Sequence, residues 1–276
     1  MKTEASLQDA SLLNVDFEYF DPSPTIDFHG LKTLLRQLLD ADHQLIDLSE
    51  LANIILAQPL LGSTVKCEGQ ESDPYAFLTV LNMTEHRFKP VMQAIKAYLS
   101  SKARSSSTEA IAKVLDATDG QVGLVLTERV INMPHQTIPP MYTMLLEEIN
   151  WAREAQEPYN FTHYLILSRA YTEVISQLED AVPPSAKKSK PSSSAAVTPE
   201  VFYFHPEDEI LKDRASASCA FEYTHQGDEG SSDSKRAFHE TGVKAQGLMM
   251  LIDASRFDST VKAVSEYLGG GEDRKS

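Results

Sequence analysis

The pattern of hydrophobic and polar positions is clearest in residues 15–40, where it predicts a strand, a turn and a helix. Apolar side chains first take every second position (Val15, Phe17 and Tyr19), which is typical of a strand with one buried face. The DPSP turn that follows ends the strand, because proline cannot donate to a sheet ladder. From Asp27, a candidate N-cap, the apolar spacing becomes that of an amphipathic helix, with Leu31, Leu34, Leu35, Leu38 and Leu39.

Similar patterns predict that helices and strands alternate along the rest of the chain. Asp47 and Glu50 form a capping arrangement, and Pro90 stands at a plausible first helical position. Trp151 falls near the end of a helix and is interpreted as an anchor in the core. Helices are expected at residues 48–55, 90–99, 107–115, 141–152 and 257–268, and strands at 60–67, 76–83, 121–130, 163–171, 200–205, 217–225 and 246–253. The alternation indicates the α/β or α+β class.

One segment, residues 181–199, breaks this pattern. It is rich in Pro, Ser, Ala and Lys without periodicity, so we interpret it as a mobile linker or surface loop. We therefore expect a flexible N-terminus (1–14), a single α/β domain (15–268) that carries this loop, and a flexible tail (269–276). The loop holds a basic cluster that is a candidate nuclear-import signal or otherwise part of a spacer: Lys187, Lys188 and Lys190.

Charge narrows the classes of partner. The 276 residues include 25 Lys and Arg against 40 Asp and Glu, a formal net charge of −15, and 42% of them are hydrophobic. A chain without a basic folded segment is a poor binder of nucleic-acid backbones or anionic membranes, whereas a basic protein is a complementary partner. The alternative interpretation is that the acidity only keeps the protein soluble. The two cysteines, Cys67 and Cys219, fit two unpaired thiols, and one long-range disulfide is the alternative.

Motifs for catalysis or cofactor binding are scarce. The sequence contains no phosphate-binding glycine loop of the G-x-x-x-x-G-K-[ST] or G-x-G-x-x-G type and no G-x-S-x-G nucleophile elbow. The eight histidines do not form an H-E-x-x-H motif or a Cys/His metal-ligand spacing. His29 and His205 are interpreted as structural hydrogen-bonding residues. The sequence therefore predicts no catalytic residue, no cofactor and no metal.

Two acidic regions are candidate partner-binding sites. In the first, the outer positions of the opening strand and helices carry Asp16, Glu18, Asp21, Asp40, Asp42, Asp47 and Glu50. In the second, an aromatic strand precedes a carboxylate run, with Phe202 and Phe204 followed by Glu207, Asp208 and Glu209. An apolar platform with an acidic rim suits Lys and Arg side chains. The structural alternative is that three carboxylates in a first helical turn favour the positive end of the helix dipole.

Four segments resemble the characteristic sequences of the BCCIP family. They are VDFEYFDPSPTIDFHGLKTLLRQLL (15–39), TERVINMPHQTIPPMY (127–142), HYLILSRAY (163–171) and VFYFHPEDEIL (201–211). The resemblance extends from about Val15 to Leu268 and implies a nuclear adaptor or chaperone without known catalysis. Fungal members escort the L-fourteen-type protein of the large ribosomal subunit and assist nuclear export of a phosphoinositide kinase. Animal members bind a cyclin-dependent-kinase inhibitor and a recombination mediator.

The fold that this resemblance implies is a three-layer α/β core, with a mixed twisted sheet flanked by helices, similar to the GNAT acetyltransferases. Those enzymes hold coenzyme A pyrophosphate on an R/Q-x-x-G-x-G/A loop, and no such loop occurs here. Family members commonly begin with a long acidic tail, whereas about fourteen residues precede Val15, so the folded domain must supply the acidity. We expect a nuclear protein, shuttling to the cytoplasm, that shields a basic ribosomal protein of the large subunit and contacts the export machinery. The alternatives are a cell-cycle or recombination adaptor for short peptides and an acyltransferase with an unusual cofactor loop.

Overall fold

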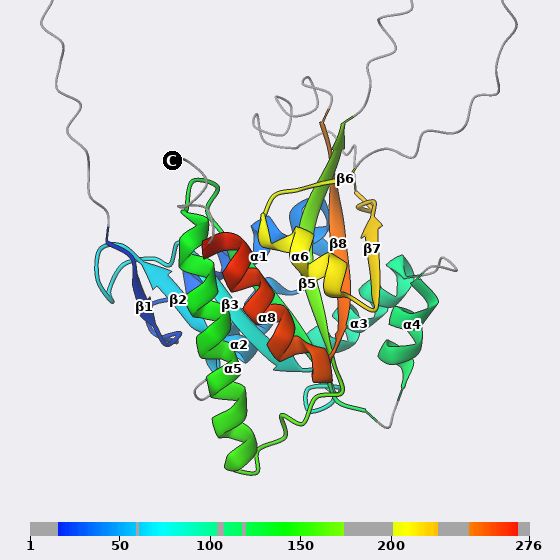
Figure 1. Cartoon of the computed structure of the whole chain (residues 1–276), viewed down its shortest axis with the longest axis horizontal. Helices are drawn as coiled ribbons and strands as arrows, with labels where there is room; N and C mark the ends of the chain where they lie inside the picture. The colour runs from blue at the N-terminus through cyan, green and yellow to red at the C-terminus, as the bar shows by residue number, and fades with distance from the viewer. Residues whose placement is uncertain are drawn as a thin grey trace, which may run out of the picture.

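A computed structural model of the chain describes residues 16–58, 61–103, 108–117, 120–173, 201–225 and 243–269 (Figure 1). An eight-stranded sheet forms its middle layer, in the order β1-β2-β3-β4-β5-β8-β7, with β6 paired to β5. The strands are β1 (Glu18–Phe20), β2 (Ser63–Lys66), β3 (Ala76–Asn82), β4 (Val122–Arg129), β5 (His163–Glu173), β6 (Val201–Tyr203), β7 (Ala217–Phe221) and β8 (Val243–Asp253). Only β4 and β5 run parallel among these pairs, so the sheet is mixed.

Helices cover both faces of the sheet and give the molecule three layers (Figure 1). The layer on one face contains α1 (Phe28–Leu39), the 3-10 helix η1 (Asp40–Leu45), α2 (Leu48–Leu56), α3 (Pro90–Lys102) and α4 (Glu109–Asp116). The layer on the other contains the 3-10 helix η3 (His135–Thr137), α5 (Ile138–Glu154), α6 (Glu207–Arg214) and α8 (Ala254–Gly269). The predicted flanked mixed sheet is therefore confirmed, while the likeness to GNAT acetyltransferases stays a prediction.

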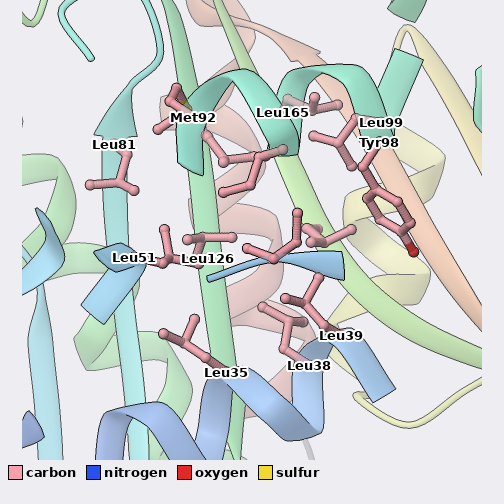
Figure 2. Packing of buried hydrophobic residues seen from close by; sticks show 14 of the residues in the cluster. Leu35, Leu38, Leu39, Leu51, Leu81, Met92, Tyr98, Leu99, Leu126 and Leu165 are labelled. Atoms are coloured by element: carbon pink, nitrogen blue, oxygen red, sulfur yellow. The ribbon is translucent and has the colours of Figure 1, made fainter. Parts of the chain in front are cut away.

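The larger apolar core lies between the sheet and helices α1, α2 and α3 (Figure 2). Leu35, Leu38 and Leu39 of α1 point toward the sheet and meet Leu126 of β4 and Leu165 of β5. All five side chains are buried, with exposed fractions of 4% or less. Burial of a leucine side chain contributes about 1.5–3 kcal/mol, so the leucine stripe read from the sequence is a main source of stability.

Helix boundaries agree with several of the predicted capping residues. The Asp47 carboxylate accepts hydrogen bonds from the backbone N–H groups of Ser49 and Glu50 at 2.9 and 3.0 Å, so it caps α2 as expected. Pro90 is the first residue of α3, where its missing N–H removes no helical bond. Asp27 precedes α1 but makes no side-chain cap bond, because its carboxylate is used elsewhere.

Two predictions about the fold need correction. Within the described residues, β1 begins at Glu18, so the opening strand is shorter than expected. Trp151 is 60% exposed on α5, so it is not a core anchor. Its neighbours Ala152 and Ile149 face the core instead, because α5 buries one side against the sheet. The predicted flexible segments 1–14 and 181–199, with Lys187, Lys188 and Lys190, lie outside the described residues, and so does the tail from 270 onward.

Candidate functional site

The carboxylates of the first acidic region are largely on the surface, but they do not form one patch. Asp16, Glu18 and Asp21 are exposed in and beside the edge strand β1, and Asp47 is exposed at the start of α2. Asp40 and Asp42 lie in η1, near residues 224–225 at the β7 end of the sheet. Asp40 and Glu50 are half-buried. The structure thus keeps most of the predicted carboxylates available to a partner, and whether they bind one stays a prediction.

Asp42 is the exception, because its carboxylate is fully buried. It accepts hydrogen bonds from the Tyr98 hydroxyl at 3.0 Å and from the backbone N–H groups of Thr224 and His225 at 2.8 and 3.0 Å. Lys102 Nζ lies 3.3 Å away. Burial by itself raises the pKa of Asp42, but these backbone donors, Tyr98 and Lys102 lower it overall. Asp42 therefore fastens residues 224–225 to the domain and cannot contact a partner directly.

The second acidic region also differs from the prediction. Glu207 and Asp208 are buried, at 1% and 0% exposure, so only Glu209 of this run reaches the surface. Glu209 accepts a hydrogen bond from the Tyr267 hydroxyl at 2.7 Å. The helix therefore turns its first two carboxylates inward, and the expected three-carboxylate rim is wrong.

The aromatic platform of that region does form. The Phe202 ring stacks on Tyr171 with centroids 5.4 Å apart, and Phe204 packs on the same tyrosine at 5.1 Å. The Arg169 guanidinium lies 4.6 Å from the centre of the Phe204 ring. All of these side chains are half-buried, so the platform is a partly exposed surface beside β5 and β6.

A buried ion-pair network that includes Arg169 of this platform fixes α6 to the sheet. Arg129, at the end of β4, donates two hydrogen bonds to the Glu207 carboxylate, one of them at 3.0 Å. The neighbouring Glu128 accepts a hydrogen bond from Arg169 Nε at 2.6 Å, and its other oxygen lies 2.9 Å from Nε2 of His205. Both carboxylates are less than 3% exposed. Buried charges of this kind are stable only when they are paired, so the network positions α6.

Burial and pairing move the pKa values of two network carboxyls in opposite directions. Burial raises the pKa of Glu128, but His205 and Arg169 outweigh it and lower that pKa to about 2. Burial also raises the pKa of Asp208, to about 7, because desolvation and the like charge of Glu207 outweigh the lowering effects of His205, Ser168 and Arg129. The Asp208 carboxyl accepts a hydrogen bond from the Ser168 hydroxyl at 2.6 Å, and its Oδ1 atom has no hydrogen-bond partner in the described residues.

Ser168, His205 and Asp208 are the residue types of a hydrolytic triad, but their arrangement differs from one. The serine hydroxyl donates to the carboxylate instead of the imidazole, and all three side chains are buried. A substrate would have no path to them through the described part of the molecule. His205 thus has the structural role that the sequence suggested, whereas His29 is exposed and stacks edge-on against Phe28.

Sequence reasoning missed the network because its partners come from β4, β5 and α6, and Arg129 and Glu207 are 78 positions apart. One signal was present: Glu128, Arg129 and Arg169 stand in or at the end of strands whose other residues are mostly apolar. Charged side chains in such strands must find partners in the interior. A second buried pair, Lys66 with Asp27 at 2.6 Å, follows the same rule.

A hollow of about 300 Å³ lies at the far end of α5 and the start of α8, and is lined by Arg153, Tyr159, Asn160, Phe161, Tyr164, Ala254 and Ser255. Its lining includes no carboxylate or histidine that could act as a general acid or base. Within the described residues, no three His, Cys, Asp or Glu side chains are grouped as they would be to hold a metal ion. Cys67 and Cys219 are unpaired, as the sequence suggested.

Comparison with known proteins links this fold to one family. The sequence model of the BCCIP family matches residues 12–211. Protein bcp1 of Aspergillus fumigatus is 54% identical over 259 residues, which is 93% of this chain and 88% of that protein. Protein bcp1 of Schizosaccharomyces pombe is 46% identical over 272 residues, which is 96% of this chain and 94% of that protein. The crystal structure of BCP1 from Saccharomyces cerevisiae is 26% identical and superimposes with a TM-score of 0.63 over 95% of this chain and 92% of that one.

Proposed function

The chain belongs to the BCCIP family, and we propose that it is a non-enzymatic nuclear chaperone that binds and shields a basic ribosomal protein of the large subunit. Family membership supports an adaptor or chaperone role in general. The proposal names the L-fourteen-type ribosomal protein as the guest and includes assistance to nuclear export of clients such as a phosphoinositide kinase. It also places the protein in the nucleus, from which it shuttles to the cytoplasm.

The observation that supports this proposal is that the described buried ion pairs are neutral overall, which leaves the net negative charge to the rest of the chain. The buried carboxyls of Asp27, Asp42, Glu128 and Glu207 have cations as partners: Lys66, Lys102, Arg169 and Arg129. The interior pairs are therefore close to neutral, and the net charge of −15 belongs to the remainder of the chain. The folded domain presents an anionic exterior, including Asp16, Glu18, Asp21 and Asp47 in the described part.

An anionic exterior suits a guest that is cationic. A ribosomal protein away from its rRNA carries unneutralised positive charge and binds other polyanions without selectivity. A folded acidic surface competes with those polyanions, steers the encounter with the guest and repels other acidic proteins. Ion pairs at such a surface are individually weak, so we expect several carboxylates to act together.

A precipitation assay tests this function. The purified ribosomal protein is mixed with RNA, and turbidity is followed with and without the chaperone. We expect the chaperone to suppress turbidity, and the triple variant Asp16→Lys/Glu18→Lys/Asp21→Lys to lose most of this protection. The control makes the same change of charge at the other end of the sheet, near β7, by reversing the exposed acids Glu109, Asp116 and Glu222, and should keep more protection. Equal turbidity with and without the wild-type chain would refute the proposal.

Nuclear location and the absence of catalysis have their own tests. Replacement of Lys187, Lys188 and Lys190 by Ala should reduce the nuclear signal of a fluorescent fusion, and unchanged localisation would leave that segment as a spacer. Calorimetric titration with acetyl-CoA tests the acyltransferase alternative. We expect no binding heat, and a saturable heat would favour that alternative over the chaperone.

A second candidate function is an adaptor that docks short extended peptides. The observation in its favour is that the sheet is open, with β1 at one end of the strand order and β7 at the other. Proteins with open sheet edges can bind peptides as an additional strand.

A further inference from the structure

Strand β1 forms one free edge of the sheet (Figure 1). It pairs with β2 through Glu18 opposite Lys66, Tyr19 opposite Val65 and Phe20 opposite Thr64. Among the described residues, no strand pairs with its outer side. In an antiparallel ladder, alternate residues point their N–H and C=O groups away from the neighbouring strand. The outer side of β1 is therefore a template for one more strand.

Contacts with β2, with Thr137 and with the core hold β1 in place, so a partner would bind to an ordered strand. The Tyr19 hydroxyl donates a hydrogen bond to the backbone carbonyl of Thr137 at 3.1 Å, which ties β1 to the start of α5. The Thr64 hydroxyl donates to the carbonyl of Phe20 at 3.3 Å. Phe17 and Tyr19 also pack against the core on the α5 side of the sheet. A preordered edge lowers the entropy that binding must overcome.

In the described residues 16–21 and 61–75, which hold β1, β2 and the turn after β2, every exposed charged side chain is acidic. Successive side chains of a strand point to opposite faces, so Glu18 lies on the face opposite to that of Phe17 and Tyr19. Exposed carboxylates flank it, namely Asp16, Asp21, Glu68, Glu71 and Asp73. The nearest cation in the ladder, Lys66, is fully buried and bound to Asp27, so it does not offset them.

Exposed apolar side chains stand at the same end of the sheet. Tyr75, the residue before β3, is 37% exposed, and Ile131, two residues after β4, is 77% exposed. The two segments touch, because the Val130 N–H donates to the Tyr75 carbonyl at 2.9 Å. Because Tyr75 and Ile131 are two and three strands inward from β1, the apolar residues of a segment bound to the outer side of β1 would meet Phe17 and Tyr19 instead.

The opposite edge, β7, is chemically different. Lys102 donates to the carbonyl of Glu222, just after β7, at 2.6 Å, and Lys244 of β8 pairs with the Glu222 carboxylate. The side chains of β7 itself are small or apolar, in the sequence ASCAF. Cations already occupy that end, so a basic segment is favoured at β1 over β7.

We propose that β1 binds an extended segment of the guest, with basic and apolar residues in alternation, as an additional antiparallel strand. This inference rests on the proposed function and names the site that holds the cationic guest. The Lys or Arg residues of the segment would face Glu18 and Asp16, and its apolar residues would face the side of Phe17 and Tyr19. Opposite charges directly across a ladder stabilise the pairing, and the backbone hydrogen bonds fix its direction.

The experiment uses the whole chain and a synthetic peptide of about ten residues in which Lys or Arg alternates with Val. Calorimetry measures its affinity, and hydrogen exchange measures the protection of the amides of Glu18, Tyr19 and Phe20. A second peptide has the same sequence with every other backbone nitrogen methylated on its pairing side, so its charge is unchanged but its strand hydrogen bonds are lost. We expect the first peptide to slow exchange in β1 and the methylated one to bind about tenfold more weakly or worse.

Variants separate the edge from the general charge. Asp16→Lys/Glu18→Lys should weaken binding of the unmethylated peptide by about tenfold, whereas Glu109→Lys/Asp116→Lys on α4 should change it by less than about threefold. Near-ultraviolet circular dichroism checks that both variants fold. Equal affinity for the two peptides, or protection at β7 in place of β1, would overturn the proposal. If the ribosomal protein binds but the peptide does not, the proposed site at β1 is wrong and the chaperone function stands. If the peptide binds at β1 and the ribosomal protein does not bind, the site at β1 stands and the chaperone function is wrong.

Discussion

The ion pair between Arg129 and Glu207 gives the sharpest stability prediction, because both side chains are in the interior at 7% and 2% exposure. Arg129→Met removes the cation and leaves the Glu207 carboxylate buried without its two hydrogen bonds. Breaking a buried pair in this way costs about 3–5 kcal/mol of the free energy of unfolding. For a chain of this size the same loss lowers the melting temperature on the order of 10 °C.

Urea unfolding followed by circular dichroism measures this change as a shift of the midpoint. Two further variants separate pairing from loss of volume. Arg129→Met/Glu207→Leu replaces both charges with apolar groups and should recover at least half of the lost free energy. Lys113→Met breaks the exposed pair with Glu109, in which the side chains are 72% and 65% exposed, and should leave the urea midpoint nearly unchanged. The reasoning fails if Arg129→Met costs no more than Lys113→Met.

Three other predictions follow from single side chains. Burial raises the folded-state pKa of Asp208 from 3.8 to about 7. Between pH 3.8 and about 7 the folded chain therefore holds a proton that the unfolded chain releases, and the free energy of unfolding falls as pH rises through this range. Asp208→Asn should remove this fall, measured by urea midpoints near pH 5 and near pH 7.5; an identical slope in the variant would contradict it. Because Trp151 is 60% exposed and is the single tryptophan, the folded protein should show red-shifted emission that acrylamide quenches readily, and a blue-shifted, protected emission would be inconsistent with the fold. Asp42→Asn should cost about 1.5–3 kcal/mol and speed amide exchange at Thr224 and His225, since it weakens a buried charged acceptor. Unchanged exchange there would show that Asp42 does not hold this segment.

The elements that could be predicted from the sequence are those whose signal is local. The leucine spacing of α1, the cap at Asp47 and the proline at the start of α3 each depend on neighbouring residues. The hairpin of β2 and β3 also follows, because two runs rich in residues that favour strands flank a polar turn. Such patterns indicate element type and buried face, and hence the flanked sheet.

The parts that could not be predicted depend on contacts between distant segments. Asp42 and Thr224 are 182 positions apart, so nothing near Asp42 shows that its carboxylate is an internal acceptor. The pattern of Glu207 and Asp208 predicts a solvated acidic run, yet these side chains bond Arg129 and Ser168 on the sheet. Trp151 was placed inside because large aromatic residues usually are, but the helix it belongs to turns that side outward. Composition is enough to predict an acidic exterior, whereas the structure is needed to identify the carboxylates that form it.

The central claim is that an anionic exterior holds a cationic guest, and the salt dependence of binding tests it most directly. The measurement is calorimetric titration of the purified large-subunit ribosomal protein with the chain at about 50, 150 and 300 mM NaCl, where the screening length shortens from well above to below 10 Å. We predict that affinity falls at least about tenfold across this range, and that Asp16→Lys/Glu18→Lys both weakens binding and reduces the dependence on salt. An affinity that stays constant from the lowest to the highest salt would contradict the claim.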